Sequence, residues 1–118
     1  MGGVAALTER EDWRRVEGVD AATPGFPAAG TVDGADVVVF RTPAGYRATA
    51  RACPHQYADM LAGTLIDDGT ALRCPVHAFA FRLSDGAGTN CPGYRLKVYD
   101  IVERDGALFA CAVAPAAG

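Results

Sequence analysis

The sequence has only two histidines among its 118 residues, and it has no excess of basic residues. Its net charge of −3 argues against a nucleic-acid binder that works through a basic patch. No stretch approaches the roughly 18 apolar residues of a membrane span. The first residues lack the basic and apolar regions of a secretory signal. We therefore expect a cytoplasmic protein without nucleic-acid or membrane contacts.

The length is that of one domain, which we expect to comprise residues 1–118 with an ordered core over about 13–113. Hydrophobic residues make up 50% of the chain and charged residues 21%, a balance that favours a globular domain over a disordered chain. A domain of this size cannot also hold a large catalytic domain.

Strand patterns dominate the sequence. Residues 35–42 are rich in β-branched side chains, residues 46–51 alternate as a half-buried strand does, and turn residues recur about every 8 to 12 positions. This rhythm predicts an all-β fold, an antiparallel sandwich or barrel. The predicted strands are 13–17, 35–42, 46–51, 71–74, 79–83, 94–102 and 107–113.

Two short segments predict hairpin turns: 43–45, which contains a proline and a glycine, and Asp105 followed by Gly106. Helix signals are few. A possible capping box runs from Thr8 to Glu11, but Pro24 and Gly25 follow without an amphipathic run. We expect one short helical turn at most.

Two cysteine–histidine pairs carry the chemistry. Cys53 and His55 have the pattern Cys-x-His, and after 18 intervening residues, 56–73, Cys74 and His77 have the pattern Cys-x-x-His. Both histidines of the chain thus follow a cysteine by two or three positions. In the reducing cytoplasm, cysteines at such spacings are more often metal ligands than disulfide partners. The pattern therefore predicts one metal centre closed by two loops.

A single cysteine is usually a small buried hydrophobic residue, and a single histidine is usually a hydrogen-bonded surface residue. It is the joint spacing of the four residues that favours a metal. Structural zinc sites pair like ligands on each knuckle, whereas each loop here supplies one cysteine and one histidine. A zinc-stabilised binding module nevertheless stays open as an alternative.

The two loops resemble those of the Rieske [2Fe–2S] family, and the resemblance covers residues 13 to about 113. It implies a Rieske-like fold of antiparallel sheets, with a cluster-binding subdomain of two loops over about 53–60 and 74–82. It also implies one [2Fe–2S] cluster, with Cys53 and Cys74 on one iron and His55 and His77 on the other. Two neutral imidazoles in place of two thiolates leave the oxidised cluster uncharged, which makes its reduction easier.

Departures from the high-potential members of the family point to a low-potential, ferredoxin-type protein. Those members join their two loops by a disulfide, but Ala58 and Val76 stand at the matching positions. They also place a serine after the second ligand histidine, where this chain has Ala78. Hydrogen bonds to cluster sulfur raise the potential, and alanine has no side-chain donor.

The other cysteines and two aromatic residues have expected structural roles. Cys111 lies in a strand pattern and is predicted to be a packed thiol. Cys91 matches the position of the proline-bearing loop that covers the cluster in similar proteins, and we expect it to be structural, with modulation of the cluster as the alternative. Tyr57 and Phe79 are expected to shield the cluster or to belong to the ordinary core.

A cluster in which protein ligands occupy the remaining coordination positions of both irons has no open position for substrate. Such a cluster transfers single electrons. Rieske oxygenases need a second iron held by two histidines and a carboxylate, and this chain has no further histidine. We therefore expect a carrier rather than an enzyme, working between a flavin-dependent reductase and a terminal Rieske oxygenase. The small subunit of an NAD(P)H nitrite reductase is the alternative within the same fold. The acidic net charge would favour a basic reductase face.

Overall fold

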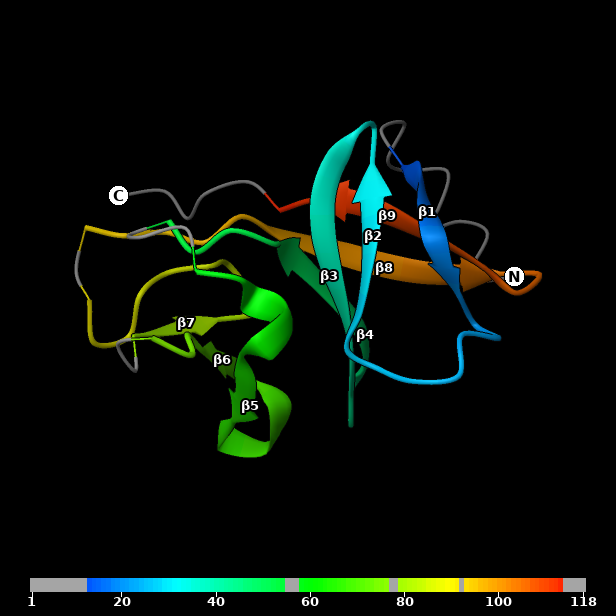
Figure 1. Ribbon diagram of the computed structural model, residues 1–118. Coiled ribbons are helices and arrows are strands. Elements are labelled where there is room, and N and C mark those ends of the chain that lie inside the picture. Colours follow the sequence, from blue (N-terminus) through cyan, green and yellow to red (C-terminus); the bar gives the residue numbers. More distant parts are fainter. Residues whose placement is uncertain (1–12, 55–57, 77–78, 92, 114–118) are drawn as a thin grey trace.

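A closed antiparallel barrel and a smaller sheet make up the structure, a computed structural model that describes residues 13–54, 58–76, 79–91 and 93–113 (Figure 1). Hydrogen-bonded neighbours in the barrel follow the order β1-β2-β3-β4-β8-β9, and β9 returns to pair with β1. The small sheet has the order β5-β6-β7 and is inserted between β4 and β8. The strands are β1 (Arg14–Asp20), β2 (Ala28–Val32), β3 (Ala35–Thr42), β4 (Gly45–Ala50), β5 (Thr64–Ile66), β6 (Ala71–Arg73), β7 (Ala80–Arg82), β8 (Val98–Arg104) and β9 (Ala107–Ala112).

Strand β3 is buried on both faces because it separates two hydrophobic cores. Val37 and Val39 face the core inside the barrel, whereas Val38 and Phe40 belong to the core beneath the small sheet. All four side chains are at most 1% exposed. The period-2 alternation of a strand thus directs successive residues of one apolar run into different cores. Strand β3 therefore contributes to the core of the barrel and to the core beneath the inserted sheet.

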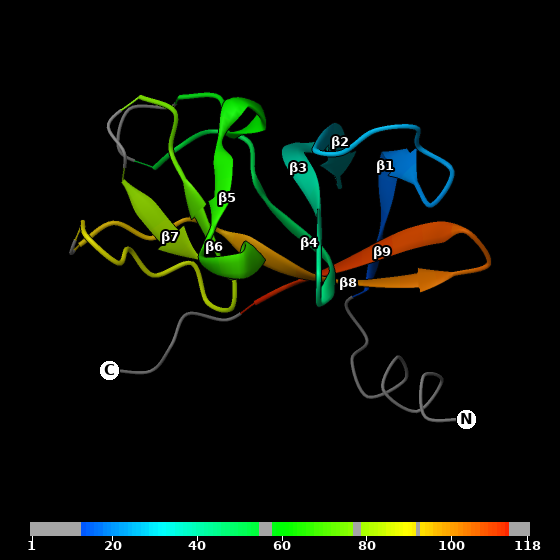
Figure 2. The same cartoon turned by 90° about the horizontal axis from the view of Figure 1, so that it is seen from below.

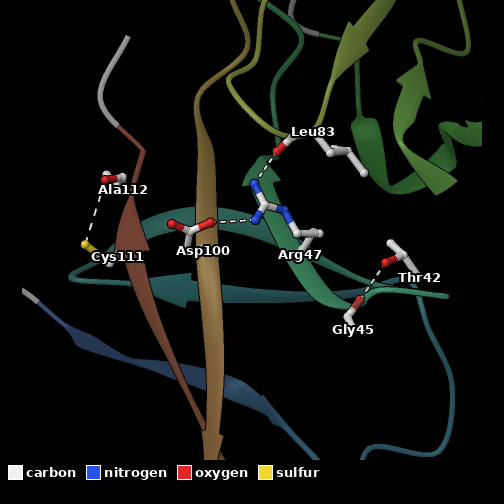
Figure 3. A network of polar contacts seen from close by, with 7 residues as sticks. All are labelled: Thr42, Gly45, Arg47, Leu83, Asp100, Cys111 and Ala112. Atoms are coloured by element: carbon white, nitrogen blue, oxygen red, sulfur yellow. Dashed lines mark hydrogen bonds and ion pairs between the residues drawn. The ribbon is translucent and has the colours of Figure 1, made fainter. Parts of the chain in front are cut away.

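A partly buried arginine also joins the two parts. Arg47 on β4 donates a hydrogen bond from Nη1 to Asp100 Oδ1 on β8 at 2.5 Å, and from Nη2 to the carbonyl of Leu83, just after β7 (Figure 3). The Arg47 and Asp100 side chains are 23% and 29% exposed. One guanidinium therefore ties two barrel strands to the inserted segment.

The hairpin turns agree with the sequence prediction. Asp105 and Gly106 have φ values of 53° and 84° between β8 and β9, the left-handed pair that a two-residue hairpin turn requires. Pro43 and Ala44 connect β3 to β4, and the Thr42 hydroxyl closes this turn by donating to the Gly45 carbonyl at 2.8 Å (Figure 3).

The prediction of one strand over 94–102 is wrong in its first half, because β8 begins only at Val98. The preceding residues turn toward the small sheet instead. Gly93 has a φ of 91°, Arg95 forms an isolated bridge with Ala87, and the Leu96 N–H donates to the Gly86 carbonyl at 2.8 Å. These contacts with residues that follow β7 prevent regular pairing before Val98.

Two 3-10 turns, η1 (Met60–Ala62) and η2 (Asp67–Gly69), exceed the single helical turn expected. The possible capping box at residues 8–11 lies outside the described residues. No helix in the described ranges is long and apolar enough to cross a membrane.

Strands β2 and β5 are absent from the sequence prediction. β5 has only three residues, too few for a pattern. β2 begins Ala28-Ala29-Gly30, residues of low strand propensity, yet it pairs with β3 along its whole length. A Cβ at Gly30 would lie 2.6 Å from the Glu17 carbonyl oxygen and 3.0 Å from Val19 Cγ2. The close approach of β1 to β2 therefore requires glycine here.

Replacement of Gly30 by alanine should destabilise the barrel by about 2 kcal/mol, because the backbone oxygen that the new methyl group meets cannot move aside easily. Gly25→Ala is the matched control, since a Cβ at Gly25 would have no atom within 4 Å. Urea unfolding of both variants checks this expectation. Equal stability of Gly30→Ala and the wild type would contradict the proposed crowding.

Candidate metal centre

The two cysteine-bearing loops are built in the same way. The Cys53 N–H donates to the Ala58 carbonyl at 2.8 Å, and the Cys74 N–H donates to the Phe79 carbonyl at 2.7 Å. In each loop the bond joins a cysteine to the residue five positions later. Each cysteine thus occupies the first position of a closed six-residue loop.

An antiparallel pair of residues holds the base of each loop. Ala52 pairs with Asp59 before and after the first loop, and Arg73 pairs with Ala80 before and after the second. Both pairs span the same number of residues. The sequence therefore presents its two cysteines on equivalent hairpin tips, although one hairpin is an isolated bridge and the other belongs to the β6–β7 ladder.

Cys53 and Cys74 lie in one hydrophobic core. Their side chains are 0% and 2% exposed, and both belong to the core cluster beneath the small sheet, together with Cys91. None of the four cysteines forms a disulfide. In both views the small sheet lies at the end of the molecule away from β1 (Figures 1 and 2). The fold thus brings the two predicted cysteine ligands to the same end of the molecule.

An ion pair anchors the first loop. Arg51 donates to both carboxylate oxygens of Asp59, at 3.0 and 2.9 Å, across the base of the loop. Asp59 also accepts the Leu61 N–H at 2.9 Å and so caps η1. The hydrogen bonds from Arg51 and from the Leu61 N–H hold the pKa of the Asp59 carboxyl below its usual value.

The second loop is held by the segment after β7, a contribution that the sequence analysis missed. Asn90 Oδ1 accepts the Ala80 N–H at 3.0 Å, and the Thr89 N–H donates to the Ala80 carbonyl at 2.8 Å. Cys91 Sγ lies 3.7 Å from the same carbonyl. Asparagine and threonine commonly bind backbone groups in loops, but nothing local in the sequence indicates that Ala80 is their partner.

Other predicted residues have varied outcomes. His55, His77, Tyr57 and Ala78 lie outside the described residues, so their roles stay predictions. Phe79 is partly buried and packs against the core that contains both cysteines, which agrees with the alternative of an ordinary core residue, and its shielding of a cluster stays a prediction. Of the two remaining cysteines, Cys91 packs in that core, and Cys111 is buried in β9, with its Sγ 3.8 Å from the Ala112 carbonyl (Figure 3).

The donor set fits an iron–sulfur centre. Two buried thiols outside any disulfide, on matched loops, are suitable thiolate ligands, which iron–sulfur clusters use. In the sequence of each loop, one histidine follows the cysteine. The arrangement can therefore close on one centre from two sides.

The ionised Asp59 carboxylate should stabilise the fold at neutral pH, and this contribution should disappear as pH falls. A depressed folded-state pKa means that the stabilisation is complete above the unfolded-state pKa, near 4, and is lost as pH falls through the lower folded-state value. Asp59→Asn should therefore melt below the wild type at pH 7, with a difference that shrinks below about pH 4. Circular dichroism melts from pH 3 to 7 measure this difference. A constant difference would argue against the ion pair.

Comparison with known proteins gives one family. The model of the Rieske [2Fe–2S] domain matches residues 12–100. The structure of the ferredoxin of carbazole 1,9a-dioxygenase from Nocardioides aromaticivorans IC177 is 27% identical with a TM-score of 0.69, covering 87% of this chain and 99% of that one. No curated protein matches the chain.

Two further structures are also similar. One is a chain from the complex of reduced oxygenase and oxidized ferredoxin in carbazole 1,9a-dioxygenase, at 28% identity and a TM-score of 0.64, covering 79% of this chain and 98% of that one. The other is the putative NADH-dependent nitrite reductase small subunit from Mycobacterium tuberculosis, at 27% identity and a TM-score of 0.69, covering 86% and 96% of the two chains.

Proposed function

The chain belongs to the Rieske [2Fe–2S] domain family, and on this premise we propose that it is a cytoplasmic ferredoxin that passes single electrons from a flavin-dependent reductase to a terminal oxygenase. As a Rieske-type electron carrier it has one [2Fe–2S] cluster as its cofactor. The observation that carries the proposal is the pair of matched loops with buried cysteines that form no disulfide, in a chain that aligns with nearly the full length of an oxygenase ferredoxin.

We assign the cluster ligands residue by residue. Cys53 and Cys74 would hold one iron through thiolates, and His55 and His77 would hold the other through ring nitrogens. The cluster supplies one-electron redox chemistry. The surrounding residues keep the thiolates out of solvent, and the closed loops fix the position of each cysteine. Exclusion of water lowers the reorganisation that accompanies each change of charge.

The proposed role is that of a carrier and not of a catalyst. Both histidines are assigned to the cluster, so none remains for the mononuclear iron that a Rieske oxygenase needs. Each turnover would take one electron from the reductase and give one electron to the acceptor, without transfer of atoms. Nothing in this cycle requires a substrate pocket in the chain.

The oxygenase is the favoured acceptor because one similar structure is a complex of oxygenase and ferredoxin. The second candidate, the small subunit of a nitrite reductase, is favoured by a similarity of equal TM-score. The two can be separated biochemically. A subunit would co-purify stoichiometrically with a large catalytic chain, whereas a ferredoxin would exchange rapidly and support many turnovers of an oxygenase. The zinc-stabilised module is disfavoured by the family match.

Replacement of His55 or His77 by alanine should abolish the rhombic Rieske EPR signal of the dithionite-reduced protein, because each removes a ligand of the same iron. Cys111→Ala should keep the signal, since this buried thiol lies in the barrel strand β9. Iron and acid-labile sulfide should both be found at two per wild-type chain. An intact signal in either histidine variant would refute that ligand assignment, and one colourless zinc per chain would refute the proposed carrier.

The reduction potential should lie in the lower part of the range of about −150 to +300 mV that Rieske centres span as a class. Ala58 and Val76 cannot form a disulfide, and Ala78 has no hydroxyl to donate toward the cluster. Voltammetry at neutral pH measures this value. A potential well above zero would show that other groups compensate for these departures. At alkaline pH the potential should fall, because ligand imidazoles lose protons more readily when the cluster is oxidised.

A further inference from the structure

The acidic net charge of the protein is unevenly distributed. The described barrel segments, residues 13–50 and 98–113, carry five basic and seven acidic residues, whereas the inserted segment 51–97 carries five basic and four acidic residues. The part of the chain that presents the two cysteine loops is therefore not acidic. Docking partners respond to the charge near the contact more than to the net charge of the whole molecule.

Local pairing leaves cations near the loops. Arg82 is neutralised by Asp85 at 2.7 Å, and Arg51 is similarly paired with Asp59. The other two acidic residues of the insert, Asp67 and Asp68, lie in η2 at the turn of the β5–β6 hairpin. Arg73 lies at the opposite end of that hairpin, immediately before Cys74. The free negative charge of the insert is thus at the far end of the hairpin from the second cysteine loop.

Two exposed arginines of the insert, Arg73 and Arg95, have no carboxylate partner in an ion pair among the described residues. Arg73 precedes Cys74 and is exposed. Arg95, also exposed, follows Tyr94 and donates to the backbone carbonyl of Asp85 at 3.0 Å. After the hydrogen bonds from the Ala87 N–H and from Arg82, its charge helps to hold the pKa of the Asp85 carboxyl below the usual value, so Arg82 and Arg95 share one carboxylate. The insert therefore carries more basic than acidic side chains, with Arg73 directly before Cys74.

An apolar centre accompanies these cations. Val76 and Tyr94 are the exposed large hydrophobic residues of the described ranges, at 55% and 42% exposed. Val76 lies within the second cysteine loop. The Tyr94 ring lies 6.0 Å from the ring of Phe79, the residue that closes the same loop. Exposed apolar side chains that gather at one place mark interaction surfaces, and aromatic residues are frequent at their centres.

We propose that this surface, defined by Arg73, Val76, Tyr94 and Arg95, is the docking face for a redox protein whose own contact surface is apolar and bordered by carboxylates. The inference rests on the proposed function, since it concerns the partner of the same cluster. It replaces the expectation that the net charge of −3 directs the chain to a basic face. Complementary charges steer the encounter, and the apolar centre excludes water from the contact.

The local charge can be tested with small oxidants before any partner is known. Ferricyanide, an anion, and hexaammineruthenium(III), a cation, each take one electron from the reduced protein in stopped-flow experiments. A cationic face predicts that the ferricyanide rate falls as salt is raised and that the ruthenium rate increases. Attraction that follows the net charge predicts the reverse in both cases, and this result would overturn the proposal.

Charge removal identifies the residues responsible. Arg73→Gln and Arg95→Gln should each slow ferricyanide reduction about threefold at low salt and flatten its salt dependence. Arg104→Gln, at the exposed end of β8 in the barrel, is the matched control and should leave both quantities unchanged. Equal slopes in all three variants would remove Arg73 and Arg95 from the proposed face.

The apolar centre needs a protein acceptor, because a small ion does not cover it. Plastocyanin, a copper protein with an acidic surface patch, serves as the probe. Tyr94→Ser should slow electron transfer to plastocyanin several-fold without changing the ferricyanide rate, and Tyr94→Phe should restore it. An equal effect of Tyr94→Ser on both oxidants would show altered cluster chemistry instead of lost docking contact, and it would contradict the proposal.

These measurements separate the two levels of inference. Every variant is first checked for the Rieske EPR signal and for an unchanged reduction potential. A wild-type chain without the signal refutes the proposed function and, with it, the docking face. A chain that has the signal but shows the reverse salt dependence refutes only the docking face.

Discussion

The pairing of β4 with β8 is the constraint on which the site depends. These strands border the inserted segment, and their pairing brings its two ends together: Thr49 is opposite Val98, and the Ala50 N–H donates to the Lys97 carbonyl at 2.8 Å. Loop closure is thereby supplied by the barrel. The barrel therefore fixes both ends of the insert, whose own strands are short and whose loops are irregular.

Two further contacts transmit this order from the barrel to the cysteine loops. Strand β3 contributes side chains to both cores, and Arg47 joins the barrel pair to the carbonyl that follows β7. Rigid support matters for an electron carrier, because a centre that moves little on changing its charge exchanges electrons at lower cost. The loops themselves are held by short-range devices, the Asp59 cap at the first loop and the Asn90 contact at the second.

The distribution of charge separates two roles within one small molecule. The described barrel segments have two more acidic than basic residues, whereas the insert has one more basic than acidic residue. The insert that carries the cysteine loops has an exposed arginine directly before Cys74, and it exposes Val76 and Tyr94. A carrier must dock briefly and then leave, which suits a small contact with a few apolar residues and a charged rim. The net charge of −3 alone would have suggested a partner with a basic contact surface.

The sequence by itself determined the all-β class, the family, the cofactor and the candidate ligands, because each depends on residues close together in the chain. Cys53 and Cys74 precede their histidines by two and three positions, and the turn at Asp105 needs only its own two residues. The tertiary structure decided three other features: strand β2, the support of Ala80 by Asn90, and the place of the basic side chains in the fold. Gly30 is in a strand because β1 and β3 pair with β2 there, although its local sequence opposes a strand. These features depend on neighbours that are distant in sequence, and only closure of the barrel and docking of the insert bring them into contact.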